Sequence, residues 1–179
     1  DGKSITMEED VQFAHYDPNV ASLMQLGKWF DYMRENGVYD NTRIILVADH
    51  GRGLYLNWDR VIDNGPDTDF FFPLLMVKDF NAKGFSFSDT FMTTADVPTL
   101  ATSGLIDNPT NPFTGNAINA NAKYDRPFYA FMSYDWDTSK NNGNQFFPGT
   151  WYRVDNQNAR DKRNWVMVGE NTVLPDALR

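Results

Sequence analysis

The feature that most constrains the fold is a run of four apolar residues that ends abruptly in polar ones. Residues 44–47 have the sequence Ile-Ile-Leu-Val, without alternation of apolar and polar side chains. Such a run is typical of a strand covered on both faces, usually a central strand of a parallel sheet. After a single alanine come Asp49, His50 and Gly51. We therefore expect a buried strand whose carboxyl end carries an acid and a histidine.

The pair at the end of this strand has the chemistry of a divalent metal site. Ligands of open α/β sheets bind outside the carboxyl ends of the strands. The Asp49 carboxylate and the His50 imidazole together suit Zn²⁺, Mn²⁺ or another borderline cation, and Gly51 allows a tight turn away from the site. An Asp-His-Gly triplet is more often an ordinary turn, so the local chemistry alone leaves both interpretations open.

A helix and a second strand are predicted on either side of this segment. Residues 17–18, Asp-Pro, suit a helix start, and apolar residues recur at helical spacing up to Gly37, which suits a helix end. The polar residues 52–69 predict a loop after the metal-binding candidates. A second buried strand is expected within residues 70–77, either after Pro73 or at the edge of the sheet, because proline lacks the donor that a strand ladder needs.

The remainder of the chain changes character after one further helix. That helix is expected to begin with Thr94 as its cap and to end at Gly104, before a loop over residues 107–121. Short aromatic and β-branched runs then predict antiparallel strands, the last two of which pair as a hairpin. These runs are residues 127–134, 150–155 and 164–168.

The whole segment 37–51 resembles a hallmark of the alkaline phosphatase superfamily. It most resembles the branch of sulfatases and lipoteichoic-acid-synthase-like phosphoglycerol or phosphoethanolamine transferases. In that branch a helix is followed by Gly-hydrophobic-x-Asp-Asn-Thr, a buried strand and Ser/Thr-Asp-His-Gly. This chain has Gly-Val-Tyr-Asp-Asn-Thr at 37–42 and Ala-Asp-His-Gly at 48–51. Ala48 departs from the family's usual Ser or Thr, at a position that is not a ligand.

The resemblance implies an α/β fold. Residues 1–122 are then the C-terminal portion of an alkaline-phosphatase-like α/β sandwich with a mainly parallel sheet. Residues 123–179 are a small antiparallel β subdomain of the same unit.

The resemblance also implies a metal-dependent transferase or hydrolase of phosphate or sulfate esters, on membrane-lipid or glycan-linked substrates. Asp49 and His50 correspond to half of the site for a divalent cation, which is Mn, Zn, Mg or Ca. Arg52 is a candidate substrate-binding residue, since its planar fork suits phosphate or sulfate oxygens; a solvated loop arginine is the more common role. The remaining family ligands, a Glu and the nucleophilic Thr, lie upstream of the matched segment.

The resemblance therefore assigns no residue of this chain as the catalytic nucleophile, which we expect upstream of it. Thr42 and Thr94 are better explained as a strand start and a helix cap. The chain opens mid-pattern, so we expect it to be a piece of a longer protein and to have little activity alone. The related enzymes imply membrane anchoring through upstream segments and a catalytic domain outside the cytoplasm, periplasmic or extracellular. An exposed sheet edge in such a piece favours self-association.

The composition excludes other classes of function. The net charge is −8 and no basic stripe is present, which argues against a nucleic-acid binder. It also argues against simple electrostatic adhesion to anionic lipid. No cysteine is present, so the chain has neither disulfides nor a cysteine-derived formylglycine. No apolar run of ~18 residues predicts a membrane-spanning helix.

An inactive binding or interaction module on the same fold is the alternative. In that interpretation four aromatic residues stack on sugars, although core and hairpin packing is the more common role of such residues. The four are Trp136, Trp151, Tyr152 and Trp165. His15 has the sequence context of a partly exposed histidine near a helix start.

Overall fold

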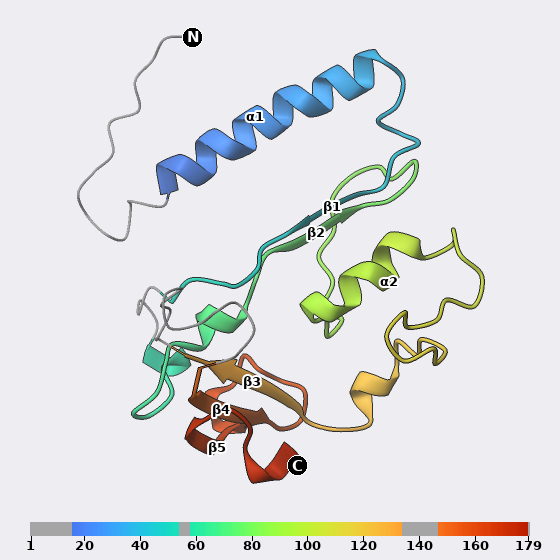
Figure 1. Cartoon of the computed structure of the whole chain (residues 1–179). Helices are drawn as coiled ribbons and strands as arrows, with labels where there is room; N and C mark the ends of the chain where they lie inside the picture. The colour runs from blue at the N-terminus through green and yellow to red at the C-terminus, as the bar shows by residue number, and fades with distance from the viewer. Residues whose placement is uncertain (1–15, 54–57, 134–146, 179) are drawn as a thin grey trace. The chain divides into compact units, whose positions relative to one another are not determined.

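The computed structural model describes residues 16–53, 58–133 and 147–178. They form a mixed α/β structure with two α-helices and two small antiparallel sheets (Figure 1). The chain divides into two compact units, which are described separately below. One unit contains Asp1–Leu46 and Leu75–Ser88, and the other contains Val47–Leu74 and Asp89–Arg179.

Helix α1, Tyr16–Glu35, confirms the predicted first helix. Asp17 lies in its first turn, and Gly37 follows its end with a φ of +67°, which favours glycine. Met33 is the buried residue of this helix, whereas Leu23 and Met24 on the predicted apolar face are exposed. No helix among the described residues is long and apolar enough to cross a membrane.

Strands β1, Ile44–Val47, and β2, Leu75–Lys78, form a two-stranded sheet (Figure 1). Both strands lie where the sequence predicts them, and β2 begins after Pro73 as expected. The backbone hydrogen bonds Ala48 N to Leu74 O and Asn81 N to Asp40 O run in the antiparallel sense. The mainly parallel sheet that the resemblance implies is not shown by the described residues.

Strand β1 is less completely covered than its sequence suggests. Ile44 is buried, but Val47 at the carboxyl end is exposed. Lys78 of β2 joins this strand to the segment before β1, because its ammonium group donates to the backbone oxygens of Tyr39 and Thr42. A sheet of two strands has few neighbours, so an uninterrupted apolar run can be partly exposed within it.

The second unit contains the short helix α2, Val97–Thr102, preceded by the 3-10 turn η3, Thr94–Asp96. The predicted cap Thr94 lies inside η3; the N-cap of η3 is Thr93, whose backbone N–H donates to the Asp96 carboxylate at 2.8 Å, and the N-cap of α2 is Asp96. The helix ends just before Gly104, as predicted. The other 3-10 turns are η1 Trp58–Arg60, η2 Thr68–Phe71, η4 Ala122–Tyr124, η5 Lys162–Asn164 and η6 Asp176–Leu178.

The core of the second unit lies on a three-stranded antiparallel sheet of β3, Phe128–Met132, β4, Gly149–Val154, and β5, Trp165–Thr172. The β4–β5 pairing confirms the predicted hairpin, and β5 begins one residue later and ends four residues later than expected. Val154 and Trp165 face each other across this pair. The buried core cluster consists of Ala130, Tyr152, Val154 and Trp165.

Candidate functional site

The Asp49–His50 pair lies directly beyond the carboxyl end of β1, as the sequence predicts. Both side chains are open to solvent, with exposed fractions of 89% for Asp49 and 69% for His50. The pair is therefore accessible to a cation or a substrate.

Among the described residues, the hydrogen bonds of Asp49 and His50 leave one potential metal-ligand atom unbonded on each side chain. The Asp49 Oδ1 accepts the backbone N–H of His50 at 2.9 Å. The His50 Nδ1 lies 2.7 Å from the backbone oxygen of Gly51. Because a carbonyl oxygen only accepts, this hydrogen bond requires the proton on Nδ1, and in the neutral imidazole the lone pair is then on Nε2. The unprotonated nitrogen is then 3.8 Å from Asp49 Oδ2.

These two free atoms fit a shared divalent cation. Zinc ligands bind at about 2.0–2.2 Å, so two ligands of one tetrahedral ion lie about 3.4 Å apart. The observed separation is 3.8 Å, which a small side-chain rotation closes. A metal-binding histidine almost always donates its other ring N–H to a carbonyl or carboxylate, as His50 does here. The described residues contain no group of three or more metal-ligating side chains, so the pair by itself offers two candidate ligands.

Two glycines hold the loop that follows the pair against η2. The Gly51 N–H donates to the backbone oxygen of Phe70 at 2.9 Å. A β-carbon at Gly51 would overlap the Asp69 carbonyl oxygen and lie 2.7 Å from that of Phe72. A β-carbon at Gly53 would overlap the Phe70 ring. Only glycine permits this close approach of two backbone segments.

The turn η2 is itself fixed by acidic side chains. Asp67 is buried and caps η2 by accepting the Asp69 backbone N–H at 3.0 Å. Asp69 forms an ion pair with Arg60 at 2.5 Å. Asp67, Asp69 and Arg60 have no predicted role, since residues 52–69 carry no periodic pattern. The paired glycines at 51 and 53 are the available sequence signal of a close backbone contact.

Arg52, the candidate substrate-binding residue, lies two residues beyond His50 and is exposed. Its position between the two fixed glycines anchors its backbone near the pair. The structure therefore places all three predicted site residues on one short loop, Asp49 to Gly53.

The four aromatic candidates for sugar stacking have different positions. Trp136, like His15, lies outside the described residues. Tyr152 and Trp165 are only 4% and 6% exposed and belong to the core. Trp151 packs on Phe131 with ring centroids 4.9 Å apart, and its indole N–H donates to the Thr172 backbone oxygen at 3.3 Å. The three described residues therefore pack within the sheet.

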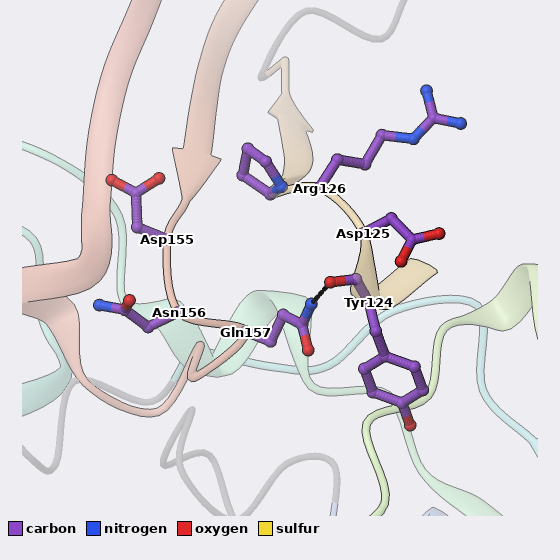
Figure 2. A pocket seen from close by; sticks show the side chains of 7 residues that line it. Tyr124, Asp125, Arg126, Asp155, Asn156 and Gln157 are labelled. Atoms are coloured by element: carbon purple, nitrogen blue, oxygen red, sulfur yellow. Dashed lines mark hydrogen bonds between the residues drawn. The ribbon is translucent and has the colours of Figure 1, made fainter. Parts of the chain in front are cut away.

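A polar hollow that the sequence analysis does not predict lies between the start of β3 and the end of β4 (Figure 2). The Gln157 side-chain amide donates to the Tyr124 backbone oxygen at 2.7 Å, and Asp155 is paired with Arg153. Asn156 and Gln157 both have positive φ angles, which are uncommon outside glycine. The Gln157 hydrogen bond therefore connects the two chain segments that line the hollow.

Comparisons with protein families, with curated proteins and with solved structures found no match to this chain. The case for a function consequently depends on the Asp49–His50 geometry and on the sequence resemblance of residues 37–51. Both concern the same loop at the end of β1.

Proposed function

We propose that the chain is the C-terminal part of the catalytic domain of a metal-dependent enzyme of the alkaline phosphatase superfamily. The enzyme is a sulfatase-like hydrolase or a phosphoglycerol- or phosphoethanolamine-type transferase. Its substrates are phosphate or sulfate esters of membrane lipids or glycans. The observation that carries this proposal is the free His50 Nε2 lying 3.8 Å from the free Asp49 Oδ2.

Each residue of the loop has a defined task in this proposal. Asp49 and His50 supply an oxygen and a nitrogen ligand to one divalent cation: Mn, Zn, Mg or Ca. The bound cation would stabilise negative charge on the transferred phosphoryl or sulfuryl group. Arg52 binds an oxygen of that group through its guanidinium. The other ligands and the nucleophile come from a part of the protein upstream of this chain.

The proposal extends to the architecture and the location of the whole protein. Residues 1–122 would complete an α/β sandwich with a mainly parallel sheet, to which upstream strands contribute, and residues 123–179 would form its antiparallel subdomain. Upstream segments would anchor the protein in a membrane, with the catalytic domain outside the cytoplasm. Helices α1 and α2 flank the two strands in the chain order of the described residues, and because β1 and β2 pair antiparallel with each other, the parallel part of such a sheet would come from the upstream strands.

The test is an esterase assay on the full-length protein. We would measure the cleavage of a chromogenic phosphodiester and a chromogenic sulfate ester with and without divalent metal. Asp49→Asn should reduce metal-dependent turnover by about 100-fold or more, because even indirect support of a metal ligand is worth 10–100-fold. Asp31→Asn, at an exposed aspartate of α1, is the matched control and should leave turnover unchanged.

The two substrates also distinguish the branches of the superfamily. Turnover of one ester that Asp49→Asn abolishes would identify the enzyme and its branch. Metal binding without turnover of either ester would indicate a transferase that needs its own acceptor.

An inactive interaction module on the same fold is the second candidate. The observation that favours it is that the described residues bring no third metal-ligating side chain to the pair. Failure of the full-length protein to bind Mn²⁺ or Zn²⁺, together with no turnover of either ester, would select the module over the enzyme.

A further inference from the structure

We infer that η2, Thr68–Phe71, is the template that sets the ring orientation and the tautomer of His50, with Gly51 as the positioning residue between them. The inference rests on the proposed function only for its consequence in metal binding. Its structural part concerns this chain alone.

The first step is the contact between η2 and Gly51. The Gly51 N–H is hydrogen-bonded to Phe70 O at 2.9 Å. The space beside the Gly51 α-carbon is closed by the carbonyl oxygens of Asp69 and Phe72. The hydrogen bond holds the peptide plane between His50 and Gly51, and the two carbonyl oxygens fix the position of the Gly51 α-carbon.

The second step leads from Gly51 to His50. The Gly51 carbonyl oxygen accepts the hydrogen bond from His50 Nδ1 at 2.7 Å. This carbonyl belongs to the peptide between Gly51 and Arg52, which runs from the fixed Gly51 α-carbon towards Gly53, whose α-carbon is confined by the Phe70 ring. Holding both glycines therefore positions the acceptor that selects the Nδ1–H tautomer. The lone pair is then on Nε2, on the side of Asp49 Oδ2. Since neutral imidazole binds a metal through its unprotonated nitrogen, η2 would preset His50 for coordination before the metal arrives.

The turn η2 is rigid enough to serve as a template because its own residues are held in place. Its cap, Asp67, is 1% exposed, and Asp69 is held by Arg60. The Phe70 ring lies against the α-carbon of Gly53. The loop of Asp49 to Gly53 is thus fastened to η2 at both glycines.

The test uses Gly51→Ala in the full-length protein, with two measurements. The tautomer of His50 in the metal-free protein is read from long-range ¹H–¹⁵N correlation spectra, with His50→Gln identifying its signals. Mn²⁺ affinity is measured by titration. We expect Nδ1–H in the wild type, a gain of Nε2–H in Gly51→Ala and a 10–100-fold weaker Mn²⁺ affinity, as for other changes to the support of a metal ligand.

Gly27→Ala is the matched control. It makes the same substitution in α1, where an added β-carbon meets nothing within 4 Å. Both the tautomer and the Mn²⁺ affinity should equal those of the wild type. An Nδ1–H tautomer and an unchanged affinity in Gly51→Ala would overturn the inference, and so would a wild-type protein with Nε2–H.

A second pair of variants decides the question if Gly51→Ala does not fold. Gly53→Ala meets the Phe70 ring, a flexible obstacle, and should weaken Mn²⁺ binding. Adding Phe70→Leu removes ring atoms and should restore part of the affinity; no restoration would overturn the inference. In one further outcome the wild type binds no Mn²⁺ while Gly51→Ala, or Gly53→Ala in its place, still shifts the tautomer of His50. That result would refute the proposed function and leave the role of η2 as a template intact.

Discussion

At the scale of single residues, Thr68 stands out because its hydroxyl is buried without a hydrogen-bond partner among the described residues. A buried unsatisfied polar group costs about 1–3 kcal/mol. Thr68→Val keeps the shape of the side chain and removes the hydroxyl. We expect it to raise the free energy of unfolding by about 1 kcal/mol, measured by urea denaturation. A decrease of similar size would show that the hydroxyl is satisfied in solution.

The sequence predicts the candidate residues of the site but not their geometry. The residue types of Asp49 and His50 predict a metal site, which stays a prediction, and their place after an apolar run predicts the position at the end of β1 that the structure shows. The tautomer of His50 depends on the Gly51 carbonyl, and the Gly51 backbone depends on η2, about twenty residues further along the chain. A contact of that separation leaves only indirect signs in one sequence, here the glycines at 51 and 53.

At the scale of elements, the ion pair between Asp96 and Lys123 joins η3 to η4 at 3.0 Å, with side chains only 13% and 18% exposed. Burial by itself raises the pKa of Asp96, but the Thr93 N–H and the Lys123 ammonium outweigh it, and the net pKa is lowered. A lowered pKa in the folded state means that the stabilisation is complete above the unfolded value near 3.8 and is lost as the pH falls through the folded value.

We therefore predict that Asp96→Asn destabilises the protein by about 1–2 kcal/mol at pH 7, since charge-assisted hydrogen bonds of this kind are worth about 1.5–3 kcal/mol. It should also flatten the loss of stability on acidification below about pH 4. Asp40→Asn is the control, because Asp40 pairs with Lys83 in an exposed position, and its variant should unfold like the wild type. Equal effects of both variants would contradict the prediction. Urea denaturation across a pH series provides the measurement.

The aromatic side of the three-stranded sheet gives a second prediction at this scale. The Trp165 ring contacts Phe71 with centroids 4.9 Å apart, and its indole N–H donates to the Ala159 backbone oxygen at 2.7 Å. Trp165→Ala should cost about 3–5 kcal/mol of unfolding free energy. Met167→Ala, on the same strand at a 56% exposed position, should cost less than about 0.5 kcal/mol. Thermal denaturation of both variants provides the measurement. An unchanged unfolding free energy in Trp165→Ala would contradict the core role of this residue and make it a candidate for surface binding again.

Elements whose ends are marked by glycine or proline were predicted well, whereas the pairing of the strands was not. Gly37 and Pro73 mark the ends that the structure shows for α1 and for the segment before β2. The apolar run of β1 is typical of a parallel strand covered on both faces, whereas among the described residues β1 pairs antiparallel with β2 and its Val47 is exposed. Its antiparallel partner, β2, is specified by hydrogen bonds between backbones and therefore leaves no side-chain pattern in β1.

At the scale of the whole molecule, the two units differ in the core that each one buries. Among the described residues, the unit of Asp1–Leu46 and Leu75–Ser88 buries Met33 and Ile44, whereas the other unit has the cluster around Tyr152 and Trp165. Amides in elements with few buried apolar contacts open locally at a low free energy. We therefore expect the amides of α1 to exchange with deuterium at least tenfold faster than those of β4 in the 179-residue chain. Hydrogen exchange read by mass spectrometry tests this, and equal protection of both elements would mean that the units unfold as one.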